Sequence, residues 1–538
     1  MGQLSAAQVL LLNNLMYMNG NAPLTDISSY EGRTVGDLVR DIDVSRFDSN
    51  KEYTTYTKGD EWRDIIQAIQ SDDTLCNTKI ESCYQGSCEE KSVLFNNPSA
   101  NEAVVVFQGT ASKEWKDNFQ GGAATDRPDG VSTAGQENAL KWYQSQNLDG
   151  YDSITVSGHS KGGNKAKYIT VMDDSVDRCI SFDGQGFSDE FVDKYQDRIA
   201  DNQYKIHNHN TSGDFVNILL NDIGDKTYYE GFNYGDGKFL ENHCPNTFFK
   251  FNGDGTYELI EAPQNKDVQN LDEFINSYLR SIPESERKQT MQLIGEMVEQ
   301  GMNGGTYKDL LNIFFDGTNS DCAADLIAYF IKYEQQNPEM AESIRNVVKE
   351  MGHEDDWLQY VDMVEGIMNS KYFDMILDSV DLIGGIIPDW VLKWLSSYIK
   401  DKYGKELTPE QLRKILQMIH NINDNKDCVV IRKNGADRKV PDSASAASGH
   451  FEVVPNVLER SSEELSSQKQ TIAELAEVVA SVRAGLGISF LALKPAIRKQ
   501  EEQMKKCGES CEQLGKALEE ISQKYITTEK NNVEKINL

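Results

Sequence analysis

The sequence predicts an α/β fold, in which a mainly parallel sheet with helices on both faces is followed by an all-α region and a C-terminal antiparallel helical hairpin. Three observations lead to this prediction. In the first half, short β-branched runs alternate with helical patterns, which is typical of a parallel sheet. After about residue 262 helical patterns dominate, and the last part carries apolar residues at seven-residue spacing.

Length and composition allow two or three domains with packed cores, because the chain has 538 residues and a hydrophobic content of 39%. The formal net charge of −32 argues against a nucleic-acid partner, whose phosphates would be repelled. No apolar run is long enough to span a bilayer, and the N-terminus lacks the basic stretch of a signal peptide. We therefore expect a protein that is cytoplasmic or is exported without a cleaved signal.

The elements of the first half are expected in the order that a parallel sheet requires. Residues 1 to about 75 are predicted to be mostly helical, and residues 76–88 to form a polar loop or a hairpin. The elements expected after them are strand 103–107, helix 136–146, strand 151–156, helix 164–172, strand 178–182 and strand 204–207. In such sheets the chemistry gathers at the carboxyl ends of the strands.

The second half shows three kinds of pattern. Residues 271 to about 425 have the apolar spacing of helices and no catalytic motif, whereas residues 427–449 have the composition of a linker. From 458 to 525 two heptad series flank a glycine-containing break, which predicts the antiparallel hairpin. The predicted divisions are a sheet-containing domain, a helical domain, a linker and a hairpin, at residues 1–262, 263–427, 428–449 and 450–538.

The motif Gly158-His159-Ser160-Lys161-Gly162 lies between a predicted strand and a predicted helix, which is the context of a nucleophile elbow. Gly158 and Gly162 leave room for a strained turn that lifts the hydroxyl of Ser160 clear of the sheet. The amide of Lys161, at the start of the helix, then points at any oxyanion formed by attack of the serine. The alternative is a glycine-rich turn with a bystander serine.

A serine nucleophile needs a base, and in folds with this elbow the chain order is serine, acid, histidine. That order favours His243 among the seven histidines. His159 lies inside the elbow, and His207 and His209 precede the better acid. The remaining three fall in the helical part or the linker. The alternative for His243 is an ordinary surface histidine of a loop.

Two aspartates follow predicted strands and are candidates for the acid that orients the base. Asp214 follows strand 204–207 and is favoured, because the loop after that strand is where the orienting carboxylate belongs. Asp183 follows strand 178–182 and is the alternative. Either residue could instead be a turn aspartate that caps its own loop.

The second oxyanion donor is expected in the loop after strand 103–107, which carries Gly109 and Thr110. The amide of Thr110 would pair there with that of Lys161. A plain strand-ending turn is the alternative. Clusters of Asp, Asn and Gly at 252–255 and 421–427 lack the full calcium-loop pattern, so we expect neither a metal nor a cofactor.

Several motifs now stand in a recognisable order. They are Phe107-Gln108-Gly109-Thr110, Trp115, Gln136 with Ala139-Leu140, and the elbow through Asn164. Over about residues 1–262 the chain resembles the class 3 lipases, and most closely the bacterial Mbeg-like branch of the α/β-hydrolases. The resemblance implies an α/β-hydrolase domain that cleaves acyl esters, with Ser160 as nucleophile and Thr110 at the oxyanion hole, and it supports Asp214 and His243. Gln108 and Lys161 replace the Arg and Leu of many class 3 lipases, so lipid preference does not carry over.

The C-terminal heptad segment ends near Tyr525-Ile526-Thr527-Thr528-Glu529. It is similar to the LXG-type and WXG-like helical hairpins of the type VII secretion pathway of Gram-positive bacteria, whose tail signal is Tyr-x-x-x-Asp/Glu. The usual Trp-x-Gly turn is absent. The resemblance implies Tyr525 and Glu529 as the secretion signal, small helical WXG-like proteins as partners of the hairpin, and an immunity protein in the producer.

Together the two resemblances describe a reversed-order type VII lipase effector, with the toxin domain first and the targeting hairpin last. We therefore predict an exported antibacterial serine lipase, of the phospholipase A or lysophospholipase kind, acting on a lipid or other acyl ester. One alternative is a cytoplasmic esterase or thioesterase whose hairpin only dimerises. The other is a non-enzymatic helical interaction protein with a degenerate hydrolase domain.

Overall fold

The computed structural model defines the α/β part almost completely and the later parts in segments. The residues it describes are 2–54, 57–111, 113–232, 241–282, 284–302, 337–350, 389–404 and 406–409, with single residues or pairs within 326–334, within 362–370 and within 412–416, and residues 470, 505, 512 and 516. The chain forms two compact units, Met1–Ser443 and Ala444–Leu538. The predicted hairpin falls in the second unit. Its heptad positions and the pentapeptide from Tyr525 to Glu529 lie outside the described residues.

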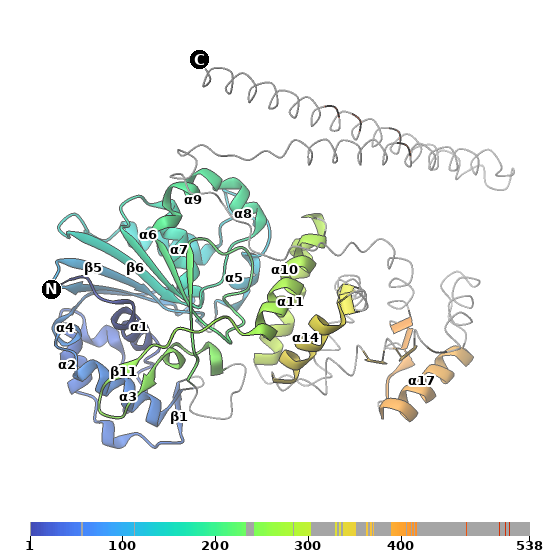
Figure 1. The fold of residues 1–538 in the computed structure, drawn as a ribbon, viewed down its shortest axis with the longest axis horizontal. Helices are drawn as coiled ribbons and strands as arrows, with labels where there is room; N and C mark the ends of the chain where they lie inside the picture. The colour runs from blue at the N-terminus through green and yellow to red at the C-terminus, as the bar shows by residue number, and fades with distance from the viewer. Residues whose placement is uncertain are drawn as a thin grey trace, which may run out of the picture. The chain divides into compact units, whose positions relative to one another are not determined.

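A seven-stranded sheet with the strand order β3-β4-β5-β6-β7-β8-β9 forms the centre of the first unit (Figure 1). The pairs β3–β4 and β4–β5 are antiparallel, and the pairs from β5 to β9 are parallel. The strands are β3 (Lys79–Gln85), β4 (Lys91–Asn97), β5 (Glu102–Phe107), β6 (Ser153–His159), β7 (Arg178–Phe182), β8 (Ile206–Thr211) and β9 (Asp225–Tyr229). Because consecutive parallel strands are neighbours, right-handed crossovers place their connecting helices on one face.

Two helical layers cover the two faces of this sheet (Figure 1). The crossover helices are α5 (Trp115–Gln120), α6 (Ala134–Gln144), α7 (Lys161–Met172), α8 (Asp189–Lys194) and α9 (Gln196–Asn202). The opposite face is covered by α1 (Ala6–Leu15), α2 (Val35–Arg40), α3 (Gly59–Gln70) and α4 (Asp73–Asn77). Alternate residues of β5 serve the two cores, since Val104 and Val106 pack with the N-terminal helices while Val105 and Phe107 pack with the crossover helices.

Short elements complete the α/β part. They are the 3₁₀ turns η1 (Ile27–Tyr30), η2 (Val44–Arg46), η3 (Gln203–Lys205), η4 (Glu241–His243) and η5 (Pro245–Phe248), and the two hairpins formed by β1 (Glu52–Thr54) with β2 (Thr57–Lys58) and by β10 (Lys250–Phe251) with β11 (Tyr257–Glu258).

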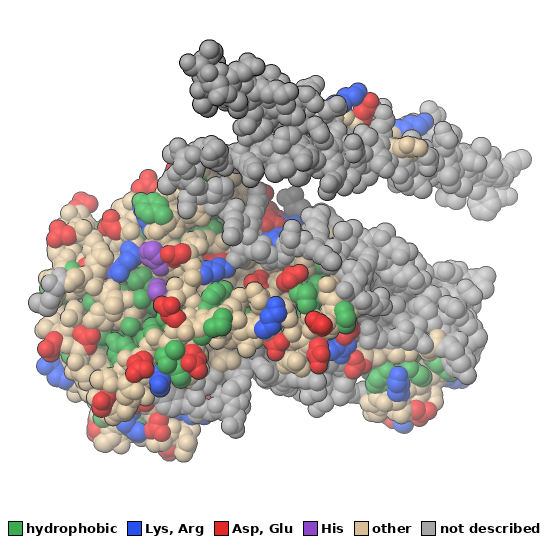
Figure 2. Space-filling model, in the orientation of Figure 1, with side chains coloured by type: hydrophobic (Ala, Val, Ile, Leu, Met, Phe, Trp, Pro, Cys, Tyr) green, Lys and Arg blue, Asp and Glu red, His purple; other side chains and the backbone are tan. Residues whose placement is uncertain are grey.

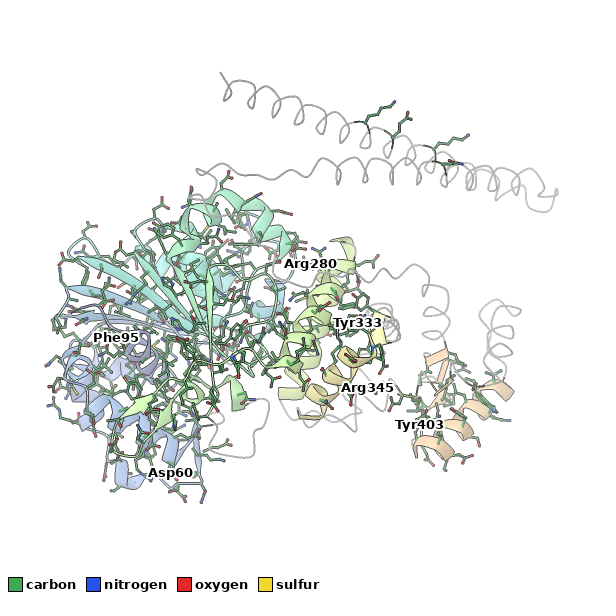
Figure 3. All side chains as sticks on the ribbon, viewed as in Figure 1. Asp60, Phe95, Arg280, Tyr333, Arg345 and Tyr403 are labelled. Atoms are coloured by element: carbon green, nitrogen blue, oxygen red, sulfur yellow. The ribbon has the colours of Figure 1, made fainter. Side chains whose placement is uncertain are left out.

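Most of the described residues after the α/β part are helical, as the sequence predicts. The helices are α10 (Lys266–Ser281), α11 (Glu284–Met302), α14 (Pro338–Glu350) and α17 (Asp389–Tyr403). They contribute to an apolar core that also contains Ala123 and Leu220 of the α/β part. Arg280 of α10 donates to Asn221 Oδ1 (3.0 Å), and Tyr333 lies in the same core (Figure 3). The helical region therefore packs against the α/β part within the first unit.

The predicted strands and helices of the first half are present, with several differences in extent. Residues 76–88 contain the end of α4, the strand β3 and part of a turn, and β3 pairs with the unpredicted strand β4 beyond that range. Helix α7 begins at Lys161 rather than Asn164, and β8 runs on to Thr211. A hydrophobicity pattern does not predict the end of β8, because the buried residues there are polar. Asn208 is one of them, and its side-chain amide donates to Ile223 O (2.7 Å). The unpredicted strand β9 has the polar sequence of a sheet edge.

The surface agrees with the acidic composition. Figure 2 shows acidic side chains spread over the described part of one face, mixed with Lys and Arg, with histidine side chains reaching the surface among them. Among the described residues, no helix combines the length and the apolar character that crossing a membrane requires.

Candidate active site

Ser160 lies between β6 and α7 in a backbone conformation that residues other than glycine rarely adopt. Its φ is 59° and its ψ is −126°. Its N–H donates to Phe182 O at the end of β7 (2.8 Å). Although Ser160 is the N-cap residue of α7, its hydroxyl makes no capping hydrogen bond. Backbone strain of this kind persists where the surrounding structure enforces it, and it clusters at functional sites.

The two glycines of the motif permit close backbone packing at this turn. A side chain at Gly158 would collide with the backbone of Gly162, and a side chain at Gly162 would collide with the carbonyl group of Phe107. Since Phe107 is the last residue of β5, the start of α7 packs closely against the beginning of the loop that follows β5. This packing lets the loop after β5 approach the first amides of α7.

His243 and Asp214 meet beside this edge of the sheet. His243 Nδ1 lies 2.6 Å from Asp214 Oδ1, and 19% of the imidazole side chain is exposed whereas the carboxylate is fully buried. Asp214 Oδ2 accepts hydrogen bonds from the amides of Val216 (2.9 Å) and Asn217 (2.8 Å) and from Asn217 Nδ2 (3.0 Å). The loop after β8 therefore holds the carboxylate, and the carboxylate orients the imidazole.

Asp183, the alternative acid, is bound elsewhere. Its oxygens accept from the amide (2.8 Å) and hydroxyl (3.0 Å) of Thr211 and from Asn217 Nδ2 (3.1 Å). Burial and the charge of Asp214 raise the pKa of Asp183 well above its ordinary value. Asn217 thus bridges the two carboxyl groups, and the one hydrogen-bonded to His243 is Asp214.

His159 packs against the candidate base. Its Nδ1 lies 2.6 Å from the hydroxyl of Tyr17, and its ring centroid lies 4.7 Å from that of His243. Burial and the neighbouring His243 lower the pKa of His159 well below its ordinary value, so the ring is neutral. The base and the elbow are therefore in contact through the residue that precedes Ser160.

The loop that carries Gly109 and Thr110 lies against the elbow. A Cβ at Gly109 would lie 3.1 Å from the carbonyl oxygen of His159, which is contact with the backbone of the motif itself. The hydroxyl of Thr110 accepts from Asn118 Nδ2 (2.9 Å). The two predicted oxyanion donors, the amides of Thr110 and Lys161, therefore belong to segments that touch.

Sequence reasoning missed three buried ion pairs around α7. Lys161, Lys165 and Lys167 are all buried, and their partners are Asp117, Glu114 and Asp222, respectively. The spacing of the three lysines was a signal for such pairs. A helix that packs against a sheet buries some of its side chains, and buried lysines need acidic partners. The sequence alone could not say which carboxylates these are.

One group of side chains has a spacing that a metal ion could use. His159, Asp183 and His243 each offer one ligand atom, and these atoms lie within 4.8 Å of one another. Imidazole nitrogens and a carboxylate oxygen are suitable ligands for a transition metal. A metal there would compete for the histidine that Asp214 orients.

The site as a whole occupies the carboxyl ends of four neighbouring strands. The loop with Thr110 follows β5, Ser160 follows β6, Asp183 follows β7 and Asp214 follows β8. This is the edge at which α/β sheets place their chemistry. A strained serine at a strand-to-helix turn, with a His–Asp pair beside it, gives this part of the chain the form of a lipase-like α/β protein.

Comparisons with known proteins agree with that class. Residues 86–295 match the family model described as Mbeg1-like. The matched residues lie outside the predicted hairpin, whose resemblance to type VII hairpins stays a prediction. No curated protein matches the chain.

Several solved lipases are weakly similar to this chain. The Lip2 lipase from Yarrowia lipolytica is 14% identical, with a TM-score of 0.26, over 41% of this chain and 76% of that one. A Rhizomucor miehei lipase–propeptide complex is 11% identical, with a TM-score of 0.26, over 45% and 76% of the two chains. For a triacylglycerol lipase from Penicillium expansum the identity is 12% and the TM-score 0.22, over 35% and 82%.

Proposed function

We propose that the chain is a serine hydrolase of acyl esters. The observation that carries the proposal is the strained Ser160 at the start of α7, on the same sheet edge as the hydrogen-bonded pair of His243 and Asp214. A serine hydroxyl that makes no capping hydrogen bond, a histidine and a buried carboxylate are the parts that nucleophilic acyl transfer requires.

In the proposed reaction Ser160 Oγ attacks the ester carbonyl carbon and His243 Nε2 takes its proton. Asp214 accepts the Nδ1–H hydrogen bond and stabilises the imidazolium. The amides of Thr110 and Lys161 stabilise the oxyanion of the tetrahedral intermediate. The imidazolium then protonates the leaving alcohol, and a water molecule activated by the same imidazole releases the fatty acid and restores the serine.

Phospholipids and lysophospholipids are the substrates that we propose within this class. The resemblance of residues 1–262 to class 3 lipases supports ester hydrolysis, and the choice among lipids depends on charge. The net charge of −32 disfavours adsorption to anionic bilayers, which favours zwitterionic or dispersed single-chain lipids. Phosphatidylcholine and lysophosphatidylcholine are therefore the first substrates to test.

The purified full chain should release fatty acid from both lipids, and a fluorophosphonate probe should abolish that release while labelling Ser160. Released fatty acid and mass spectrometry of the labelled peptide are the measurements. Hydrolysis of a short-chain ester alone would favour the cytoplasmic esterase. A folded protein that neither reacts with the probe nor cleaves any ester would contradict the serine mechanism and favour the interaction protein.

We also propose that the hairpin directs export through a type VII pathway, with WXG-like partners and an immunity protein in the producing cell. The support is the heptad pattern and the Tyr525-x-x-x-Glu529 sequence. In a Gram-positive host with that pathway, Tyr525→Ala and Glu529→Ala should deplete the protein from the medium while the cell-associated amount is maintained. Glu520→Ala, in the same segment, is the matched control. Equal secretion of all variants would refute the signal.

A further inference from the structure

Helix α7 places charged groups where a sheet-packed helix normally places apolar ones. The exposed fractions of the side chains of Lys161, Lys165 and Lys167 are 0%, 2% and 0%. Burying a lysine requires a partner, and even a paired lysine retains much of its desolvation cost. Replacing such pairs by apolar residues is often neutral or stabilising, so fold stability alone does not explain three of them on one helix.

Two of the three lysines reach the segment that carries Thr110. Lys161 Nζ lies 2.8 Å from Asp117 Oδ2, and Lys165 Nζ donates to Glu114 Oε1 (2.6 Å). Asp117 belongs to α5, and Glu114 is the N-cap residue of that helix. Lys167 differs, because it pairs with Asp222 in the loop after β8 and also donates to the carbonyl oxygen of Gly184 (3.0 Å).

The carboxylates at this end connect directly to the residues around Thr110. Glu114 Oε2 accepts from the amide of Ala111 (3.1 Å), the residue after Thr110. Asn118, next to Asp117, donates to the Thr110 hydroxyl (2.9 Å). Lys161 and Lys165 are therefore each one or two contacts away from the loop that holds the second oxyanion donor.

Asp117 also accepts hydrogen bonds from the start of α6. Its Oδ2 accepts from the hydroxyl of Thr133 (2.6 Å) and its Oδ1 from the amide of Gly135 (3.0 Å), at the start of α6. Burial raises the pKa of Asp117, but the charge of Lys161 and the hydrogen bonds from Thr133 and Gly135 outweigh that effect and bring it to about 2. The carboxylate of Asp117 is consequently ionised throughout the pH range of an esterase assay.

We propose that the pairs Lys161–Asp117 and Lys165–Glu114 act as a clamp that fixes the Thr110 amide relative to the Lys161 amide. Lys161 then has two roles, since its amide is a proposed oxyanion donor while its side chain holds the loop of the other donor. The clamp residues are positioning residues and do not touch the substrate. This inference depends on the proposed esterase function and extends it.

A clamp of this kind affects the transition state more than the bound ester. Preorganised donors stabilise the charge that develops on the carbonyl oxygen during attack, and displacing a donor weakens that stabilisation without altering the rest of the substrate contacts. Loss of the clamp should therefore lower kcat and leave KM nearly unchanged.

The test compares Lys161→Met and Asp117→Asn with the control Lys167→Met. All three variants break a buried ion pair of α7, but the control leaves the segment around Thr110 intact. Active serines are titrated to completion with a fluorophosphonate in one sample, and kcat and KM for a short-chain ester are measured in an untreated sample and expressed per titrated serine. Inhibition by an alkyl boronic acid, whose tetrahedral adduct needs the oxyanion donors, is measured in parallel.

We expect the two clamp variants to lose about 10- to 100-fold in kcat, since a displacement of about 1 Å can cost that much. KM should change by less than about 3-fold, and boronate affinity should fall in parallel with kcat. The control should retain kcat per titrated serine within about 3-fold even where its melting temperature falls.

The result that would overturn the clamp is a clamp variant with fewer titratable serines but unchanged kcat per serine, because this indicates a role in stability only. A control that loses as much kcat as the clamp variants would overturn it as well. If Lys161→Met does not fold, Asp117→Asn, which keeps the shape of the side chain, decides the question. A wild-type protein that is inert to ester and probe would instead refute the proposed function.

Discussion

Replacing Ser160 by Ala should lower kcat for ester hydrolysis on the order of 10⁵- to 10⁶-fold, as removal of a triad serine does in other hydrolases. The substitution removes the attacking oxygen and leaves the strained turn in place, so substrate binding should persist with KM close to that of the wild type. Released fatty acid, measured over long incubations, is the readout for the slow variant. Activity within about 10-fold of the wild type would exclude Ser160 as the nucleophile.

Ser181→Ala is the matched control for this experiment. Ser181 lies on β7 and pairs with Gly158 in the sheet register, and its buried hydroxyl has no hydrogen-bond partner among the described residues. Removing it should therefore cost little stability and leave kcat within about 3-fold of the wild type. A double variant Ser160→Ala/His243→Ala should be no slower than Ser160→Ala, because members of one catalytic unit are not additive. A further large loss in the double variant would indicate that His243 acts independently of Ser160.

The parts of the site that could be predicted are those whose signals are local in the chain. The elbow combines a strand, two glycines and a helix within a short segment, and the positive φ of Ser160 follows from that combination. His243 and Asp214 could be predicted from the chain order serine, acid, histidine. That order reduces the number of candidate histidines and aspartates without any knowledge of distances. The parallel direction of the central strands followed from the alternation of strand and helix patterns in the same way.

The parts that could not be predicted depend on contacts between distant segments. Asp117 and Glu114 carry no signal that assigns them to Lys161 and Lys165, because any acidic residue on a covering loop would serve. The bridging role of Asn217 between two carboxyl groups is likewise a property of the folded loop. Polar residues buried in β8 hid the end of that strand, since hydrophobic periodicity reports burial only where the buried residues are apolar.

Asn substitutions at Asp214 and Asp183 should show which of the two aspartates orients His243. Asp214→Asn should lower kcat by about 10⁴-fold, because an amide facing Nδ1 favours the wrong tautomer of His243 and does not stabilise the imidazolium. Asp183→Asn should keep kcat within about 10-fold. An uncharged side chain of the same shape can still accept from the Thr211 amide and Asn217 Nδ2 through its oxygen. Equal losses at both positions would refute the assignment of Asp214 as the sole orienting acid.

The pH dependence of stability gives Asp183 a second and independent test. Its pKa in the folded protein lies well above the ordinary value, whereas in the unfolded chain it ionises near pH 4, at about 3.9. Folding therefore takes up a proton at this residue, and its contribution to the free energy of unfolding falls as the pH rises from about 4 toward the folded pKa. Asp183→Asn removes that dependence. The free energy of unfolding of the variant, minus that of the wild type, should therefore increase as the pH rises from about 4 to 7, as measured by urea titrations. A constant difference across that range would show that Asp183 is ionised in the folded protein.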